Sequence, residues 1–438
     1  MAEAEITIEK LSYGGAGFGR LEGKACFVPF TAPGDRVRIG LVKEKRSFVE
    51  GELLELCDPS PLRVAAPCPV FGRCGGCDWQ FLPYAEQLAQ KGAIFSETLQ
   101  RIGRVPSEAV LPVLPSPNEY GYRSRIQLKL AHLKERSILG FFQAGSHRVV
   151  DASCGCQIAD PLLNRMADQF RALLLRLPKV RALSQIDLSI GADDQGIAVV
   201  HLEPGAAGAL KEAFSARRAE LPSVSGLFLR SGAKARVEKV FGIESLAYRV
   251  PAGFLPGSPE LVLRFGRGGF SQVNYPQNLE LIAAVHRFAR LSGTERVLDL
   301  YCGNGNISLP LATYAASVLG VEGYAPSIED ARANAAANGI ANARFEVGDV
   351  ARVVGRLATE GERFDLVVLD PPRSGAEAAG EIARLAPWRI VYVSCDPPTL
   401  ARDLALLAEN GYRVAASQPV DMFPQTYHLE SVTLLERL

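Results

Sequence analysis

The C-terminal part of the chain alternates between short apolar segments and alanine-rich helical stretches, and this pattern constrains the fold more than any other feature. The apolar segments span residues 296–300, 318–322, 343–347, 364–369 and 390–394. Strands that alternate with helices at this spacing build a parallel sheet that is covered by helices on both faces. We therefore predict a doubly wound, Rossmann-like α/β fold for residues 266–438.

The first sixty residues have a different pattern, with short strands broken by turn residues. The segment 13–19 is rich in glycine, and Pro33, Gly34 and Asp35 form a turn signal. Several short strands in so small a unit indicate a β-barrel of the oligonucleotide-binding (OB) kind, although composition does not separate it from other small barrels. We predict such a barrel over residues 1–60.

The middle of the chain, residues 61–265, combines prolines, cysteines, one clear helical pattern and several strands. Apolar residues recur at helical spacing between residues 84 and 102, and strand patterns dominate from about residue 122. These features predict a central α+β domain, whose helix at 84–102 can pack on the C-terminal domain.

Charge and hydropathy restrict the partners of the chain. Its 438 residues include 48 basic and 48 acidic residues, so the net charge does not indicate a nucleic-acid partner. Residues 121–150 are locally basic; the cations are Arg123, Arg125, Lys129, Lys134, Arg136 and Arg148, against one acid, Glu135. This strip fits a surface that faces RNA and fits a solvated strand equally well.

No apolar run approaches the roughly 20 residues that cross a bilayer, and the acidic N-terminus is unlike a secretory signal. We expect a cytoplasmic protein that does not bind membranes.

A Gly-x-Gly turn follows the first predicted strand of the C-terminal sheet. Gly303 and Gly305 let the backbone approach a ligand at the carboxyl edge of the sheet, where doubly wound sheets bind nucleotides. Asp299 stands just before the turn, and Glu322 ends the next strand, where an acid can hold ribose hydroxyls. The turn lacks the third glycine of dinucleotide sites and the Gly-Lys-Ser/Thr of phosphate loops. Acids here suit the cationic, phosphate-free S-adenosylmethionine; the alternative is a structural turn in another α/β domain.

Two further acids end strands at the same edge of the sheet. Asp349 follows the third predicted strand, where it could take an adenine amino group, and Asp370 closes the fourth strand before two prolines. The prolines keep the loop from becoming helical at once, so we expect the Asp370 carboxylate to point into the crevice.

The fifth predicted strand ends in Ser-Cys-Asp-Pro-Pro, which places Cys395 at the crevice. Addition of a thiolate to C6 of a uracil ring makes C5 nucleophilic enough to accept a methyl group, so Cys395 is a candidate nucleophile. A base must then remove the C5 proton; Glu430 is the candidate and His428 its rival. The alternative for Cys395 is a buried strand-end thiol, and we expect packing roles for Cys302 and His428.

The other cysteines suggest a metal centre. The chain has nine cysteines, an odd number that argues against a disulfide framework. Cys68, Cys74 and Cys77 are closely spaced with glycines among them, so three thiolates can converge on one centre. Cys154 and Cys156 can each supply a fourth ligand. Zinc and a [4Fe–4S] cluster fit four cysteines equally well.

Together these motifs resemble the RNA uracil-5-methyltransferase family, specifically its bacterial 23S ribosomal RNA branch with an N-terminal TRAM domain. The resemblance covers nearly the whole chain and implies that residues 1–60 form the TRAM barrel. It also implies that Cys68, Cys74 and Cys77 are ligands of a [4Fe–4S] cluster. Cys156 is the fourth ligand by the same resemblance, because the segment that it begins reads like the family's segment.

The resemblance further implies which residues act. Cys395 resembles the family's nucleophile and Glu430 its proton-abstracting base, and residues 270–274 resemble the motif whose glutamine contacts S-adenosylmethionine. The implied cofactor or active-site contacts are Gln272, Tyr301, Asn306, Glu322 and Asp370. We therefore expect 5-methyluridine formation in RNA, with 23S rRNA favoured over tRNA, and no obligate protein partner.

Two residues depart from the family's pattern. Asp396 follows the nucleophile where the family usually has Asn, and Gln425 stands where it usually has His; both could alter how the uracil edge is held.

Two rival functions stay open. One is an amino-group methyltransferase, whose site generally has an aromatic residue after the prolines, where this chain has Arg373. The other is a non-catalytic RNA-binding protein on a degenerate methyltransferase fold.

Overall fold

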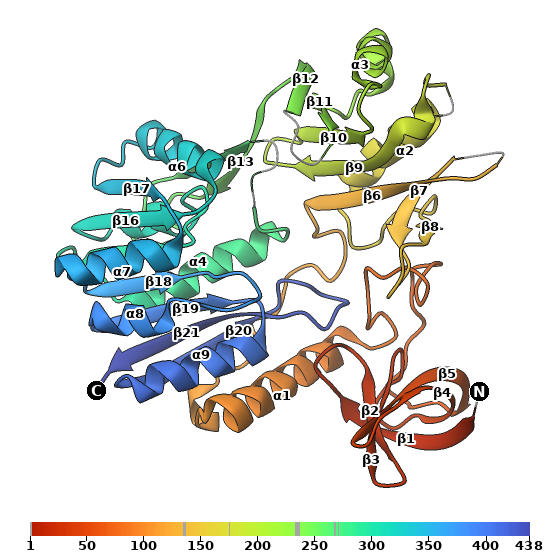
Figure 1. Ribbon diagram of the computed structural model, residues 1–438, viewed down its shortest axis with the longest axis horizontal. Coiled ribbons are helices and arrows are strands. Elements are labelled where there is room, and N and C mark those ends of the chain that lie inside the picture. Colours follow the sequence, from red (N-terminus) through yellow and green to blue (C-terminus); the bar gives the residue numbers. More distant parts are fainter. Residues whose placement is uncertain (1, 135–136, 175, 233–236, 267–268, 270) are drawn as a thin grey trace.

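The computed structural model describes residues 2–134, 137–174, 176–232, 237–266, 269 and 271–438. These residues form a closed barrel, a central sheet, a two-stranded ribbon and a C-terminal sheet. In Figure 1 the barrel and the central sheet lie on one side of the molecule and the C-terminal α/β unit lies on the other. Glu135, Arg136 and Phe270, which belong to the sequence motifs above, lie outside the described residues.

The N-terminal unit is a barrel that closes in the order β1-β2-β3-β5-β4. Its strands are β1 (Glu3–Leu11), β2 (Gly17–Leu21), β3 (Lys24–Val28), β4 (Arg36–Glu44) and β5 (Phe48–Asp58). β1 pairs antiparallel with β4, and β3 pairs parallel with β5, which closes the ring. Alternate residues such as Ile6, Ile8, Val37 and Ile39 point into the barrel and are at most 5% exposed. The predicted small barrel is confirmed.

Residues 59–83 form no helix or named strand and lead into α1 (Tyr84–Gly103). One face of α1 carries Phe95 and Leu99, which are fully buried in a core shared with α9 (Pro397–Glu409). Figure 1 shows α1 running beside α9 between the barrel and the C-terminal unit. The helix therefore packs on the C-terminal unit, although the central sheet follows it in sequence.

The central unit is a sheet in the order β12-β11-β10-β9-β6-β7-β8, antiparallel except where β10 meets β11. Its strands are β6 (Arg125–His132), β7 (Ser137–Phe142), β8 (Val149–Asp151), β9 (Leu183–Ile190), β10 (Gly196–Leu202), β11 (Gly226–Ser231) and β12 (Val237–Gly242). The helices α2 (Pro161–Leu174) and α3 (Ala207–Ala216) cover one face, with Phe170 and Phe214 in the shared core. The other face carries polar side chains such as Gln127, Asp187 and His201, and also the apolar side chains of Ile197 and Phe228. Short 3-10 helices span Ser107–Ala109, Val180–Ala182 and Arg218–Glu220.

The ribbon of β13 (Ser245–Val250) and β14 (Leu261–Gly266) lies against α6 (Ala325–Ala337). The N–H groups of Val262, Arg264 and Gly266 donate to the side chains of Asn338, Asn334 and Asp330 at 2.9, 2.8 and 2.9 Å. The donors are two residues apart on the strand and so point to the same side of it. The acceptors are four residues apart and so lie on one face of the helix, which lets the two rows of groups pair. The helix thereby satisfies the free edge of the ribbon and fastens it to the C-terminal unit.

The C-terminal sheet has the order β17-β16-β15-β18-β19-β21-β20. Its strands are β15 (Arg296–Leu300), β16 (Ser317–Glu322), β17 (Ala343–Val347), β18 (Leu366–Leu369), β19 (Arg389–Ser394), β20 (Tyr412–Val420) and β21 (Glu430–Arg437). β15 to β19 are parallel, as predicted. β21 runs antiparallel between β19 and β20, and the sequence had indicated neither β20 nor β21.

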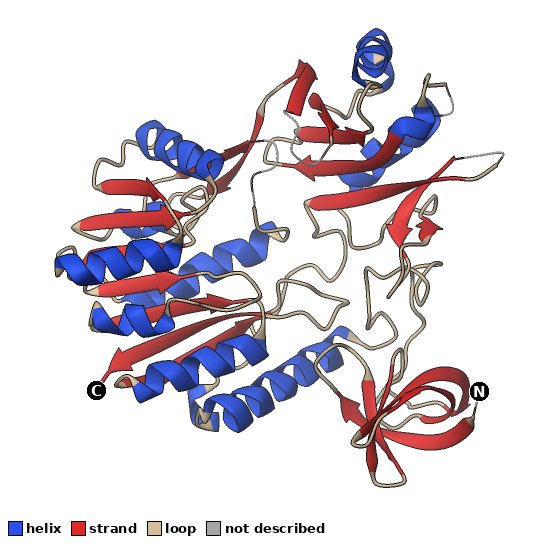
Figure 2. Cartoon of the chain, in the orientation of Figure 1, coloured by secondary structure: helices blue, strands red, loops and turns tan. Residues whose placement is uncertain are grey.

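Helices cover both faces of this sheet, as Figure 2 shows. α4 (Tyr275–Ala289), α5 (Ser308–Ala312) and α6 pack on one face, and α7 (Val350–Glu360), α8 (Ala379–Arg384), α9 and α1 pack on the other. Successive residues of β19 point to opposite cores: Val391 and Val393 face α4, whereas Ile390 and Tyr392 face α9. Burial on both sides explains why these strands read as continuous apolar runs. In the described ranges no helix combines the length and the apolar character needed to cross a lipid bilayer.

A buried ion pair joins α1 to the C-terminal unit. Lys91 Nζ lies 2.6 Å from Asp421 Oδ1 and donates to Phe423 O at 3.0 Å, and both charged side chains are 0% exposed. Burial lowers the pKa of Lys91, and the Asp421 carboxylate opposes that change. Trp79 lies close by, with its ring centroid 5.9 Å from the ammonium group.

We expect Lys91→Met to lower the free energy of unfolding by about 3–5 kcal/mol, because it leaves the Asp421 carboxylate buried without a cation. Urea unfolding followed by tryptophan fluorescence measures this, since Trp79 is buried beside Lys91 and Trp388 is 66% exposed. Lys10→Met is the matched control. Lys10 pairs with Glu97 at the surface, and the loss of such a pair costs at most about 1 kcal/mol. Equal losses of unfolding free energy in the two variants would contradict the claim that the buried pair stabilises the protein more than the surface pair does.

Candidate functional site

The C-terminal sheet has its topological switch point between β15 and β18. From β15 the chain proceeds to β16 and β17 on one side and then returns to β18 and β19 on the other. Ligands bind α/β sheets outside the carboxyl ends of the strands at such a point. The turn after β15 lies there, and Tyr301, Gly303 and Gly305 in it have positive φ angles of 64°, 54° and 90°. Two glycines ease a backbone path that side chains disfavour.

A small cavity of about 40 Å³ lies beside this turn. Four of the predicted cofactor residues and four further polar residues line it: Gln272, Tyr301, Asn306 and Asp370, with Tyr248, Ser271, Asp299 and Asn304. The structure therefore brings these predicted residues together from separate segments of the chain.

Two carboxylates give the cavity a negative character. Asp299 is 1% exposed; its Oδ2 accepts from the Ser308 hydroxyl, and its Oδ1 has no hydrogen-bond partner among the described residues. Burial raises the pKa of Asp299 to about 7, and the charge of Asp370 adds to the rise. Burial also raises the pKa of Asp370 to about 7, with a contribution from Glu322. A cation in the crevice would relieve this repulsion.

Asn306 is held by two residues that the sequence analysis missed. Asn278 exchanges two amide hydrogen bonds with it at 2.8 and 3.0 Å, and the Tyr248 hydroxyl donates to its Oδ1 at 2.9 Å. Asn278 belongs to α4 and Tyr248 to β13. Neither lies in a motif of the sheet, so no local pattern could have indicated them.

The other two predicted cofactor residues do not line the cavity. Glu322 Oε1 accepts from the Tyr324 N–H at 2.8 Å. Asp349 is exposed and caps α7 by accepting from the Arg352 N–H at 3.0 Å. Burial and nearby carboxylates, those of Asp349 and Glu322 among them, raise the pKa of Tyr301 to about 12. These two acids therefore lie around the turn rather than in the cavity.

Cys395 directly follows β19, and Glu430 begins the adjacent strand β21. β19 pairs antiparallel with β21 and aligns Ser394 with Ser431, which brings the next residue, Cys395, close enough to Glu430 for the charge of that carboxylate to act on its thiol. Glu430 is 4% exposed, and its Oε2 has no hydrogen-bond partner among the residues that the structure describes. The two candidate reacting groups thus meet at the carboxyl edge of the sheet.

The surroundings of these groups favour their protonated forms. Burial raises the pKa of Cys395 to about 12; Glu430 and Asp370 add to the rise, and Arg373 opposes it. Burial and Asp370 raise the pKa of Glu430 well above its usual range. The surroundings of His428 instead favour its unprotonated form, because burial and then the charge of Arg373 lower its pKa to about 4. Its ring contacts the ring of Tyr427, with centroids 4.1 Å apart.

The two residues that depart from the family's pattern both make structural hydrogen bonds. Gln425 is 1% exposed; its Oε1 accepts from the Gln87 side chain and its N–H donates to that side chain, each at 2.9 Å. Its side chain is thus directed toward α1. Asp396 caps α9 through Oδ1, which accepts from the Thr399 N–H at 3.0 Å, and its Oδ2 accepts from the Tyr13 hydroxyl at 2.6 Å.

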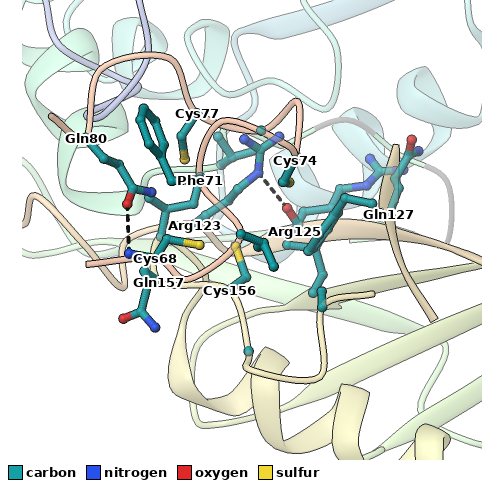
Figure 3. Close-up of a pocket in the computed structure, with 18 residues that line it drawn as sticks. Cys68, Phe71, Cys74, Cys77, Gln80, Arg123, Arg125, Gln127, Cys156 and Gln157 are labelled. Carbon is teal, nitrogen blue, oxygen red and sulfur yellow. Dashed lines mark hydrogen bonds between the residues drawn. The ribbon is translucent and has the colours of Figure 1, made fainter. Parts of the chain in front are cut away.

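Four of the predicted metal ligands surround one cavity of about 320 Å³, shown in Figure 3: Cys68, Cys74, Cys77 and Cys156. Cys154 does not line this cavity; it is exposed, and its thiol donates to the Gly155 carbonyl at 3.5 Å. Burial raises the pKa of Cys74 to about 11 and also raises those of Cys77 and Cys156. Within the described ranges, no three Cys, His, Asp or Glu side chains are grouped to hold a metal ion.

The segment that carries Cys68, Cys74 and Cys77 and continues to Trp79 makes hydrogen bonds to the barrel, to the central sheet and to the C-terminal unit. The Gly75 N–H donates to Phe142 O of the central sheet, and the Trp79 indole donates to Gly15 O of the barrel, both at 2.9 Å. The Asp78 N–H donates to Gln425 O of the C-terminal unit, also at 2.9 Å. The segment is therefore a structural junction.

The predicted basic strip divides between two surfaces. Arg123 and Arg125 line the cysteine cavity. Arg125 also lines a groove of about 650 Å³ on the helix-free face of the central sheet. Lys129 instead donates to the Gln185 side chain.

The chain matches two family models. Residues 83–438 match the tRNA (uracil-5-)-methyltransferase family, and residues 2–54 match the TRAM domain. The 23S rRNA (uracil(1939)-C(5))-methyltransferase RlmD of Methylococcus capsulatus is 36% identical over 441 residues, which cover 98% of this chain and 96% of the relative. An uncharacterized RNA methyltransferase of Halalkalibacterium halodurans is 36% identical over 443 residues, 99% of this chain and 96% of the relative.

A solved structure agrees over nearly the full length. The Pyrococcus abyssi tRNA (uracil-54, C5)-methyltransferase in complex with S-adenosyl-L-homocysteine has a TM-score of 0.75 and 26% identity, and the match covers 98% of this chain and 99% of that chain. The chain therefore belongs to the RNA uracil-5-methyltransferase family, as its motifs predicted, and carries that family's methyltransferase fold behind an N-terminal TRAM domain.

Proposed function

We propose that this protein methylates C5 of a uridine in RNA, with Cys395 as the nucleophile and Glu430 as the base. The observation that carries the proposal is the pairing of β19 with β21, which brings the Cys395 thiol within reach of the buried Glu430 carboxylate, one oxygen of which has no partner among the described residues. Both groups lie at the carboxyl edge of the sheet, where the charge of Asp370, the residue after β18, acts on each of them.

The acids around the turn suit S-adenosylmethionine. Asp299 Oδ1 is buried without a partner among the described residues, and Asp299 and Asp370 repel each other, so a cationic ligand would stabilise their charged forms. When bound, S-adenosylmethionine supplies an electrophilic methyl group. The residues that would hold it are Gln272, Tyr301, Asn306, Glu322, Asp349 and Asp370. Binding of S-adenosyl-L-homocysteine by the Pyrococcus abyssi protein supports this assignment.

The reaction follows from the two side chains. The Cys395 thiolate forms a bond to uracil C6, and the electron pair of the C5–C6 double bond moves to C5, which bonds to the methyl group as the bond between that methyl group and the sulfonium sulfur breaks. Glu430 then accepts the C5 proton. The electron pair left behind restores the C5–C6 double bond as the C6–S bond breaks and the thiolate leaves.

The pKa shifts fit these roles. A carboxyl group whose pKa is raised is a stronger base once it is ionised, which suits Glu430 for removal of a carbon-bound proton. The raised pKa of Cys395 means that most of the thiol is protonated near neutral pH. We therefore expect the first step to accelerate as the pH rises, and Arg373, which lowers the pKa of Cys395, to favour the thiolate.

We assign 23S rRNA as the substrate. The RlmD enzyme of Methylococcus capsulatus acts on 23S rRNA and is 36% identical, whereas the Pyrococcus abyssi enzyme acts on tRNA and is 26% identical. A tRNA is the second candidate, because that structure matches the whole chain.

Cys68, Cys74, Cys77 and Cys156 would hold a [4Fe–4S] cluster. Four thiolates can hold either a single zinc ion or a [4Fe–4S] cluster. A cavity of about 320 Å³ lined by four cysteines suits a bulkier cluster. When bound, the cluster would neutralise the buried thiolates and stiffen the junction between the three units.

We expect Cys395→Ala to lower methyl transfer at least about 10³-fold, because no other group replaces the nucleophile. Mapping of 5-methyluridine in total RNA should show a mark in 23S rRNA in cells that carry the gene, and no mark without the gene or with Cys395→Ala. Cys57→Ala, a change in the barrel, is the control and should retain the mark. A full mark with Cys395→Ala would contradict the mechanism, and a mark only in tRNA would contradict the assigned RNA.

Glu430→Gln should stall the reaction after methylation, because the C5 proton stays and the C6–S bond cannot break. Turnover should fall about 10²- to 10⁴-fold, and denaturing gels should show a covalent complex with ordinary uridine RNA. His428→Gln tests the rival base. Accumulation of the complex in His428→Gln, and its absence in Glu430→Gln, would transfer the role to His428.

Protein purified without oxygen should contain about four iron atoms and four sulfides per chain. Cys156→Ser should lose most of the iron and the visible absorption, whereas Cys154→Ser, the matched control, should retain both. Iron and sulfide analysis measures this. Bound zinc in place of iron, or equal losses in the two variants, would contradict the assignment.

A further inference from the structure

The loop between β1 and β2 of the barrel reaches the end of β19. Tyr13 in this loop donates from its hydroxyl to Asp396 Oδ2 at 2.6 Å, although 383 positions separate the two residues in sequence. Its ring also meets the ring of Tyr427 edge-on, with centroids 5.7 Å apart. Asp396 directly follows Cys395, so the barrel contacts the neighbour of the proposed nucleophile.

The loop is held close to the site by its glycines and by one indole. Gly14 and Gly15 have φ angles of 97° and 88°, and the Trp79 indole donates to Gly15 O at 2.9 Å. A Cβ atom at Gly15 would lie 3.0 Å from the Tyr427 ring. The approach of Tyr13 to Asp396 is therefore a fixed feature of the barrel rather than a chance contact of a surface side chain.

Both oxygens of the Asp396 carboxylate have a donor. Oδ1 accepts from the Thr399 N–H at 3.0 Å, which caps α9, and Oδ2 accepts from Tyr13. The charges that act on the Cys395 thiol are those of Glu430 on β21, of Asp370 and Arg373 after β18, and of Asp396 itself. Three of these groups are acidic and one is basic, so the direction of the Asp396 carboxylate bears on how readily a thiolate forms.

We propose that Tyr13 is a positioning residue for Cys395: its hydrogen bond holds the Asp396 carboxylate toward the barrel and so permits the thiolate to form. The inference rests on Cys395 being the nucleophile proposed above. Without the hydroxyl, Oδ2 loses its donor and the carboxylate can turn toward the crevice, where its charge opposes that of the thiolate. Burial and the bond to Asp396 raise the pKa of Tyr13, so the phenol stays protonated and remains the donor.

The test is the pH dependence of covalent adduct formation by the full-length protein with S-adenosylmethionine. The RNA is a 23S rRNA transcript made with 5-fluorouridine, or a tRNA transcript if the mapping above places the mark there. Fluorine at C5 cannot leave as a proton, so the C6–S bond persists. In Tyr13→Phe we expect the profile to move to higher pH by about 0.5–1 unit, which near neutral pH is about a 3- to 10-fold loss of rate.

Two variants separate positioning from a structural contact. Asp396→Asn removes the charge, so its profile should move to lower pH, and Tyr13→Phe added to it should cause no further shift. Tyr314→Phe is the matched control, because its hydroxyl donates to Pro256 O at 2.8 Å in another part of the protein. We expect it to keep the wild-type profile.

An unshifted profile in Tyr13→Phe, or a loss of rate that is equal at every pH and in both backgrounds, would overturn the role of Tyr13. If Tyr13→Phe does not fold, the shift of Asp396→Asn decides the matter, and its absence overturns the inference. Adduct formation by Cys395→Ala would overturn the proposed mechanism itself. Loss of the adduct in Cys395→Ala together with an unshifted Tyr13→Phe would overturn only the positioning role.

Discussion

The antiparallel pairing of β19 with β21 is the constraint on which the proposed active site depends. Val432 and Leu434 of β21 lie in the core toward α4, and Leu435 lies in the core toward α9; all three are 0% exposed. A slip by one residue would turn each of these side chains to the opposite face, so burial on both faces fixes the register. The closeness of Cys395 to Glu430 therefore follows from the apolar packing of β21.

Much of the C-terminal fold could be predicted from the sequence, because strands buried on both faces read as apolar runs. β15 and β17 begin and end where the sequence indicates, and β18 begins at Leu366 rather than at residue 364. β20 escaped detection because it contains buried polar residues. Ser417 hydrogen-bonds to Thr433, and Gln418 accepts from Arg287 and donates to Pro112 O; these partners lie elsewhere in the chain.

At the candidate site, too, some residues could be predicted from the sequence and others could not. The glycine turn, Asp370 and Cys395 sit at strand ends, and strand ends are readable in sequence. Tyr13, Tyr248 and Asn278 come from the barrel, the ribbon and α4, and only the assembled fold brings them to the crevice. The proposed fourth cysteine ligand shows the same limit: spacing does not separate Cys154 from Cys156, whereas in the fold Cys156 lines the cavity and Cys154 does not.

The most direct measurement is mass spectrometry of the peptide that carries the RNA in the covalent adduct. Trypsin releases residues 390–402, in which Cys395 is the single cysteine. We expect a methylated 5-fluorouridine nucleotide on this peptide. The nucleotide on a peptide with another cysteine, such as Cys302, or no adduct with an RNA that the protein methylates, would contradict the account.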